Sequence, residues 1–134
     1  IGISFYPMWH GKSLNELQNQ LSNLSINFNK EILIAETSYP FTLGWNDWTN
    51  NIVGLEEHLI LPEYPASPQG QKDFIRDVKN LILEVNNGIG FCYWGAGSIA
   101  WDGETSTNGS TWENQAVFDF NNKELPVLKE FNLD

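Results

Sequence analysis

The alternation of short apolar runs with amphipathic segments is the feature that most constrains the fold of this chain. Residues 31–35 form a nearly continuous apolar run, which is typical of a strand buried on both faces of a parallel sheet. Residues 89–94 form a second buried run, and the alternating segment 1–6 ends at Pro7, as a short strand would. Helical segments separate these three runs. The pattern predicts an α/β fold in which crossover helices join parallel strands.

The two predicted helices have capping signals and one apolar face each. Ser13 is followed three residues later by Glu16, which is the spacing of a capping box, and this helix ends near residues 27–30. Ser67-Pro68 combines an N-cap with proline at the first helical position, and Asn86-Asn-Gly88 ends the second helix. The apolar faces consist of Leu14, Leu17, Leu21, Leu24 and Phe28 in the first helix and of Phe74, Ile75, Val78, Leu81, Ile82 and Val85 in the second.

The loops after the predicted strands are long and aromatic, whereas those after the helices are short. They occupy residues 7–12, residues 37 to about 65 and residues 95 to about 114, and a short strand or turn at 116–120 precedes a short helix around 126–131. This asymmetry is typical of a (β/α)8 barrel, whose active site is built from the loops at the carboxyl ends of the strands. A doubly wound sheet is the main alternative, but the glycine-rich first turn that usually marks its ligand site is absent.

The length of the chain fits only part of such a barrel. A complete barrel needs ~250 residues, and the chain has 134. We therefore expect residues 1–134 to form one partial barrel domain with about three of the eight strand–helix units.

Charge and cysteine content exclude several functions. Seven basic and seventeen acidic residues give a net charge of −10, which disfavours nucleic acid, anionic membrane surfaces and acidic polysaccharides as partners. Cys92 is the single cysteine, so the chain has neither an intramolecular disulfide nor a cysteine-rich zinc site. No apolar run approaches the ~18 residues of a membrane span. Six tryptophans suit a surface that stacks on neutral sugars, although they would also suit a core.

Glu36 is the strongest candidate for a catalytic residue. It directly follows the apolar run 32–35, where a buried strand meets its loop. A carboxylate at this place in a barrel is seldom explained by packing alone, because the barrel interior beneath it is filled with side chains and excludes water. The structural alternatives are an ion pair with an arginine or a cap on the next turn.

Four segments, taken in order and spacing, resemble one family of enzymes. They are Phe5-Tyr-Pro-Met-Trp-His-Gly11, Ala35-Glu-Thr-Ser-Tyr-Pro-Phe41, Phe91-Cys-Tyr-Trp94 and Trp112-Glu-Asn-Gln-Ala-Val-Phe-Asp119. Together they resemble glycoside hydrolase family 53, the arabinogalactan endo-β-1,4-galactanases, from residue 1 to about 128. The resemblance implies the C-terminal part of a (β/α)8 barrel, about strands six to eight, with the N-terminal part of the barrel as partner. It further implies hydrolysis of internal β-1,4 bonds in neutral galactan.

The resemblance also implies roles for three residues at strand ends. Members of the family act by a retaining mechanism, with the acid/base on strand four and the nucleophile on strand seven, which corresponds to Glu36. Tyr6 ends strand six, where related barrels place a tyrosine that hydrogen-bonds the nucleophile. Trp94 ends strand eight and resembles the tryptophan platform beneath the sugar at the cleavage point. The strand-four half is not in this sequence, so we expect the isolated chain to be inactive.

Three further residues are expected to bind substrate. Trp9 and His10 lie in a loop that lines sugar subsites in the family, although a lone histidine is often only structural. Tyr39 follows the nucleophile and either lines the cleft or braces its loop.

The chain departs from the family pattern in two loops. After Trp94 the family commonly shows Glu-Pro and another aromatic residue, whereas this chain has Gly95-Ala-Gly-Ser98. Some members hold calcium between the loops after strands seven and eight, but the stretch 45–50 offers too few carboxylates for an oxygen cage. We therefore expect no metal and no cofactor, and we expect Glu113 to be a structural hydrogen-bonder.

Two other functions remain open. The chain could be a non-catalytic carbohydrate-binding or interaction fragment that kept the aromatic cleft, or an acidic, tryptophan-rich structural domain. The absent strand-four half favours the binding fragment when the chain stands alone. The resemblance implies a secreted, cell-surface or periplasmic protein of bacterial type.

Overall fold

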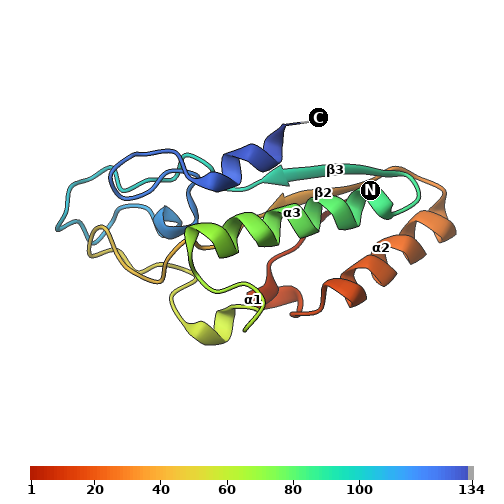
Figure 1. Ribbon diagram of the computed structural model, residues 1–134, viewed down its shortest axis with the longest axis horizontal. Coiled ribbons are helices and arrows are strands. Elements are labelled where there is room, and N and C mark those ends of the chain that lie inside the picture. The colour runs from red at the N-terminus through yellow and green to blue at the C-terminus, as the bar shows by residue number, and fades with distance from the viewer. Residues whose placement is uncertain (133–134) are drawn as a thin grey trace.

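The computed structural model describes residues 1–132 and shows parallel strands joined by helices (Figure 1). The elements in chain order are β1 (Gly2–Ser4), α1 (Pro7–His10), α2 (Leu14–Phe28), β2 (Ile32–Thr37), the 3-10 helix η1 (Glu56–His58), α3 (Pro68–Glu84), β3 (Gly88–Tyr93), and the 3-10 helices η2 (Glu113–Gln115) and η3 (Pro126–Phe131). None of the helices in the described range is long and apolar enough to cross a membrane.

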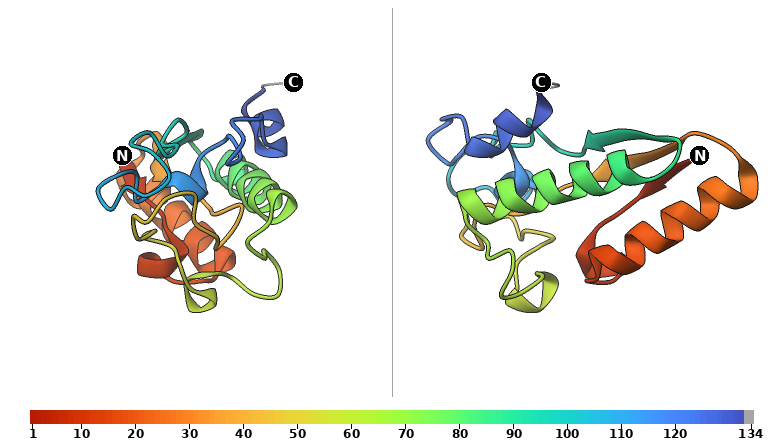
Figure 2. Two further views of the ribbon diagram at one scale, coloured as in Figure 1. Left: turned by 90° about the vertical axis from the view of Figure 1, so that its left-hand side faces the viewer. Right: turned by 45° about the vertical axis from the view of Figure 1, so that its right-hand side comes forward.

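The sheet has the order β1-β2-β3, and both neighbouring pairs are parallel. Ile34 at the centre of β2 pairs with Ile3 on one side and Phe91 on the other. Helices α2 and α3 contact each other and β2, and they cover the same side of the sheet (Figures 1 and 2). A doubly wound sheet carries helices on both faces. The arrangement confirms the α/β prediction and rules out the doubly wound alternative for the described residues.

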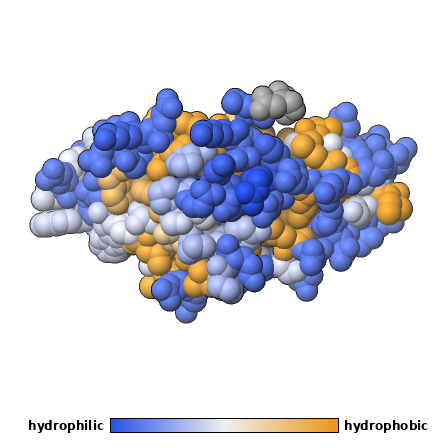
Figure 3. Space-filling view, in the orientation of Figure 1, coloured by the Kyte–Doolittle hydropathy of each residue, from blue (hydrophilic) through white to orange (hydrophobic). Residues whose placement is uncertain are grey.

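The predicted N-caps Ser13 and Ser67 and most of the predicted helix faces are confirmed. The side chains of Ser13 and Ser67 accept hydrogen bonds at the starts of α2 and α3, and every predicted core residue of α3 is buried. The prediction for Phe28 is wrong, because its side chain is exposed in the last turn of α2. At that turn the inward position belongs to Ser25, which is buried and donates to the carbonyl of Asn86. Figure 3 shows hydrophobic surface at this end of α2.

The predicted loop after β1 contains one short helix, α1. Pro7 occupies the first helical position, where its fixed φ favours a helix. The amide of Tyr6 donates to Nδ1 of His10 at 2.9 Å, and Gly11 ends the helix with a φ of 94°. This local contact between a backbone amide and an imidazole has no signature in apolar periodicity.

Strands β2 and β3 are less buried than predicted. In β2, Ile32 and Ile34 are fully buried, whereas Leu33 on the opposite face is only partly buried. Strand β3 is an edge strand in which Ile89 and Cys92 are exposed. Phe91 and Tyr93 pack against Phe131 of η3, so Cys92 points to the opposite face, which no helix of the described residues covers, whereas Ile89 lies at the open edge of the sheet.

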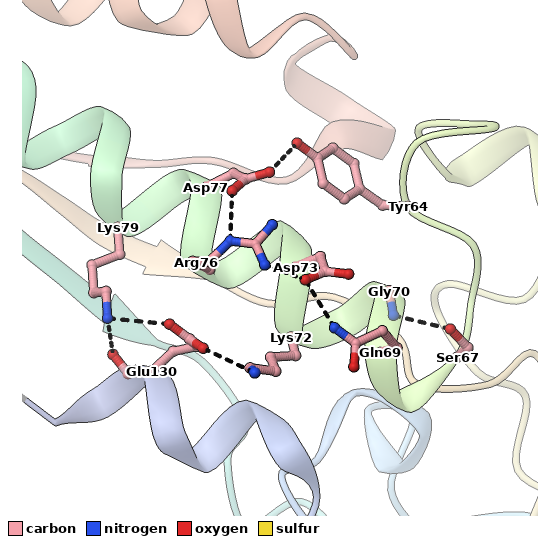
Figure 4. Close-up of polar contacts among 10 residues, drawn as sticks. All are labelled: Tyr64, Ser67, Gln69, Gly70, Lys72, Asp73, Arg76, Asp77, Lys79 and Glu130. Carbon is pink, nitrogen blue, oxygen red and sulfur yellow. Dashed lines mark hydrogen bonds and ion pairs between the residues drawn. The ribbon is translucent and has the colours of Figure 1, made fainter.

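Ion pairs hold η3 against α3 (Figure 4). The carboxylate of Glu130 lies 3.2 Å from Nζ of Lys79 and 3.7 Å from Nζ of Lys72. On another face of α3, the hydroxyl of Tyr64 donates to Oδ2 of Asp77 at 2.8 Å. The short helix predicted near the end of the chain is therefore present and attached to α3.

Side chains of η2 join the loops that follow β2 and β3. Asn114 is fully buried, and its Nδ2 donates to the carbonyls of Thr42 at 2.9 Å and Val53 at 2.7 Å. The backbone carbonyl of Asn114 accepts a hydrogen bond from the backbone amide of Phe41 at 2.9 Å. Buried backbone groups need partners, and Asn114 supplies them where the loop has no strand beside it.

Glu113 makes a second connection between these loops. Its buried Oε1 accepts from the amide of Asn46 at 2.7 Å, which agrees with the expected structural role. Burial raises the pKa of the Glu113 carboxyl above its ordinary value, and the negative charge of Asp47 raises it further. Compared with the unfolded chain, the folded loops therefore shift the Glu113 carboxyl towards its protonated form.

Gly88 marks a close approach of β3 to the end of α3. A Cβ at this position would lie 1.8 Å from the carbonyl oxygen of Ile82 and 2.9 Å from that of Val85. We expect Gly88→Ala to lower the free energy of unfolding by about 1–3 kcal/mol in urea denaturation, because these backbone segments must separate. Gly97→Ala is the matched control, since a Cβ there meets no atom within 4 Å. Equal stability of the two variants would contradict this packing.

The raised pKa of Glu113 predicts a pH-dependent contribution to stability. Because folding favours the protonated carboxyl, this contribution is present at low pH and is lost as the pH rises through the folded pKa. Glu113→Gln keeps an acceptor for Asn46 and removes the ionisation. We expect the Tm of this variant, relative to the unsubstituted chain, to increase between about pH 4 and pH 7. Glu104→Gln controls for the loss of one charge, and a decrease over this range would show that the fold favours the ionised carboxylate.

Candidate active site

The candidate site lies at the carboxyl ends of the strands, on the side where the long loops gather (Figure 1). Glu36 is the second-to-last residue of β2, and Tyr6 lies two residues after the end of β1. The hydroxyl of Tyr6 donates to Oε2 of Glu36 at 3.2 Å. The amide of Phe5 also donates to the Glu36 carbonyl, at 2.8 Å. The parallel register thus brings together two side chains that are 30 residues apart, in the contact that the family resemblance implies.

Tyr6 is a buried and neutral hydrogen-bond donor. Its side chain is 6% exposed, with the rings of Trp9 and Trp112 at centroid distances of 5.3 and 5.6 Å. Burial and the negative charge of Glu36 both raise the pKa of Tyr6 well above its ordinary value. The hydroxyl therefore keeps its proton at neutral pH and holds one oxygen of the carboxylate in place.

Trp9 and Trp94 each leave a large part of the ring open to solvent near this pair. Trp9 is 51% exposed and Trp94 is 47% exposed. The amide of Trp94 donates to the carbonyl of Thr37, the residue after Glu36, at 2.9 Å. Exposed indole rings near a carboxylate can stack on the C–H faces of a sugar.

The ring of Trp112 also belongs to the site, although no role was predicted for this residue from the sequence. Its centroid lies 6.5 Å from that of Trp9 and 6.3 Å from that of Trp94. It comes from a polar loop without periodicity, so its place could not be read from hydrophobic pattern. The one signal was its position directly before Glu113-Asn-Gln115, inside a segment that resembles the family.

Buried polar side chains fix the backbone just after Glu36. The hydroxyl of Ser38 donates to Oε1 of Gln115 at 2.7 Å, and the hydroxyl of Tyr93 donates to the Gln115 carbonyl at 2.7 Å. From α3, Nε2 of Gln71 donates to the carbonyl of Tyr39 at 3.0 Å. Sequence periodicity gives no sign of these contacts, because each joins distant segments.

Tyr39 braces the loop that follows Glu36, which is one of the two roles predicted for it. It is 1% exposed, and its ring stacks on Phe74 at a centroid distance of 4.3 Å. Its hydroxyl donates to the carbonyl of Tyr64 at 2.7 Å and accepts from the amide of Ile60 at 3.0 Å. Because Tyr39 also borders the small pocket beside Tyr6 and Trp9, its contact with substrate stays a prediction.

His10 is exposed beside the site but is engaged with the backbone. Its Nδ1 accepts the amide of Tyr6, and the two rings lie 6.2 Å apart. The structure thus gives His10 a supporting contact to Tyr6.

Two carboxylates in the loops after β2 and β3 accept hydrogen bonds from backbone amides. Within residues 1–132, no group of three histidine, cysteine, aspartate or glutamate side chains is placed to hold a metal ion. Asp47 accepts from the amide of Thr49 at 2.6 Å, and Glu113 accepts from Asn46. Each carboxylate keeps one buried oxygen without a hydrogen-bond partner. Calcium takes six to eight oxygens, which carbonyl and amide groups supply as well as carboxylates, so the expected absence of a metal stays a prediction.

Known proteins match the chain over nearly its whole length. The model of the family described as "Glycosyl hydrolase family 53" matches residues 1–131. The chain is 35% identical to the arabinogalactan endo-β-1,4-galactanase of Cellvibrio japonicus, over 100% of this chain and 36% of that protein. It is 31% identical to the endo-β-1,4-galactanase of Bacillus subtilis, over 96% of this chain and 37% of that protein.

A solved structure supports the same relationship. The chain matches the "Ignisphaera aggregans GH53 catalytic domain" with a TM-score of 0.88 and 42% identity, over 99% of this chain and 38% of that one. The chain thus spans about a third of the length of the relatives it matches. Its sequential parallel strands, with helices on one side, form part of a (β/α)8 barrel. On sequence and structure together, the chain belongs to glycosyl hydrolase family 53.

Proposed function

We propose that this chain is the part of a retaining endo-β-1,4-galactanase that carries the catalytic nucleophile, and that Glu36 is this nucleophile. The observation that carries the proposal is the hydrogen bond from Tyr6 to Glu36 at the carboxyl ends of the strands. This is where barrel enzymes build their active sites. Family membership supports the choice of galactan as the polymer, since related proteins are named as galactanases.

The proposed reaction proceeds through a covalent intermediate. With Oε2 of Glu36 held by Tyr6, we assign the attack on the anomeric carbon to Oε1. The C–O bond to the leaving sugar breaks as a general acid protonates its oxygen, and water later hydrolyses the glycosyl ester with that acid acting as base. The two carboxyl groups of a retaining enzyme lie ~5–5.5 Å apart. We assign the acid to strand four, in the N-terminal part of the barrel, outside this sequence, with strands β1 to β3 as barrel strands six to eight.

A neutral polymer fits the charge and the aromatic surface of the chain. A net charge of −10 repels a chain of uronates, whereas neutral galactan carries no such penalty. The open faces of Trp9 and Trp94 suit the apolar faces of galactose units. Because a polysaccharide does not cross a membrane unaided, we place the reaction outside the cytoplasm, in a secreted, cell-surface or periplasmic protein.

Glu36→Gln tests the proposal in the full-length protein that contains this chain. The variant keeps the side-chain shape but loses the nucleophile, so we expect kcat on galactan to fall by several orders of magnitude. Binding of galactotetraose, measured by calorimetry, should change little. Glu57→Gln, on the exposed helix η1, is the matched control and should keep the activity.

Three outcomes would contradict parts of this proposal, which are the nucleophile, the neutral substrate and the hydrolytic activity. Glu36→Gln activity within about tenfold of the unsubstituted enzyme would place the nucleophile elsewhere. Equal release of reducing sugar from galactan and polygalacturonate would exclude the neutral-polymer specificity. Binding of galactan by the unsubstituted full-length protein without any hydrolysis would favour the carbohydrate-binding alternative.

A further inference from the structure

The ring of Trp112 connects the aromatic side chains of the candidate site. Its centroid lies 5.6 Å from Tyr6, 6.5 Å from Trp9 and 6.3 Å from Trp94. The interplanar angles are 56°, 65° and 69°, which are tilted and edge-to-face arrangements. Tyr6 and Trp9 belong to the segment after β1, and Trp94 follows β3. Trp112 therefore joins two parts of the site that come from opposite edges of the sheet.

The backbone holds Trp112 in a defined place. Its amide donates to Oγ of Ser110 at 3.2 Å, and its carbonyl accepts the amide of Gln115 at 2.9 Å. Gly95, with a φ of 71°, turns the chain directly after Trp94. A Cβ on Gly95 would lie 3.6 Å from the Cβ of Trp112, so this turn passes against the tryptophan. The stretch Gly95-Ala-Gly-Ser98, which departs from the family pattern, carries no aromatic side chain, and Trp112 supplies an aromatic ring beside Trp94.

A small pocket lies beside Tyr6. A cavity of about 10 Å³ is bounded by Tyr6, Trp9, Gln115 and Trp112, among others. This volume holds at most about one water molecule. Removal of the Trp112 ring would open space directly beside Tyr6, whose hydroxyl must stay within hydrogen-bond distance of Glu36.

We propose that Trp112 is a positioning residue of this site. It holds the ring of Tyr6 so that the hydroxyl stays on Glu36, and it holds Trp9 and Trp94 at the angles in which their open faces meet the sugar. The inference deepens the proposed function and rests on it for its kinetic consequences. Its structural content, the immobilisation of Tyr6, does not depend on the reaction.

A double-mutant cycle in the full-length protein tests the kinetic part. With galactotetraose as substrate, we expect Trp112→Ala to lower kcat about tenfold and to raise KM several-fold, because small misplacements of reacting groups are costly. Trp112→Phe should restore both constants to within about threefold. In the background of Tyr6→Phe, Trp112→Ala should change kcat less than about threefold, since no hydroxyl remains to be positioned.

The control is Trp101→Ala, which removes a tryptophan that is 69% exposed and should leave kcat unchanged. Equal losses of kcat from Trp112→Ala in both backgrounds would overturn the positioning role, and so would an unchanged KM with an unchanged kcat. If Trp112→Ala does not fold, Trp112→Leu replaces it in every comparison.

A spectroscopic measurement separates this inference from the proposed function. With 3-fluorotyrosine incorporated, Tyr6→Phe identifies the fluorine resonance of Tyr6. We expect Trp112→Ala, but not Trp101→Ala, to shift and narrow this resonance as the ring gains freedom. A protein that hydrolyses no galactan would refute the proposed function, whereas an unchanged Tyr6 resonance would refute the role of Trp112.

Discussion

The buried backbone of the loops after β2 and β3 needs hydrogen-bond partners, and the rest of the site depends on the side chains that provide them. Asn114 binds two carbonyls of the first loop, and Glu113 binds an amide of it. Gln115 accepts from Ser38, two residues beyond Glu36. Glu113, Asn114 and Gln115 are consecutive and buried, so one short segment fixes both loops at once. The aromatic residue directly before them, Trp112, is fixed with them.

The sheet determines which groups meet at the centre of this frame. Parallel pairing of β1 with β2 places Tyr6 against Glu36, and the donor that results is a neutral phenol. A lysine or arginine in that position would neutralise the carboxylate, whereas the hydroxyl orients it and leaves its charge in place. Burial keeps the phenol protonated. The chemistry proposed for Glu36 therefore relies on the register of β1 with β2 and on the burial of Tyr6.

Sequence patterns predicted the features that depend on neighbours along the chain. Apolar periodicity gave the long helices and the parallel strands, and the end of an apolar run marked Glu36. The features that were missed depend on distant contacts. The burial of Tyr39 comes from stacking on Phe74 of α3, and the place of Trp112 comes from side chains on two other segments. The exposure of Ile89 and Cys92 in β3 follows from the edge position of the strand and from the face that the helices leave uncovered, and periodicity reveals neither.

Covalent trapping tests the assignment of Glu36 most directly. A slow fluorinated galactoside would be incubated with the full-length protein, and the labelled peptide would be identified by mass spectrometry after proteolysis. We expect one glycosyl group, attached to the Glu36 carboxylate, and none in Glu36→Gln. A label on any other residue of an active protein would contradict the account and place the nucleophile elsewhere.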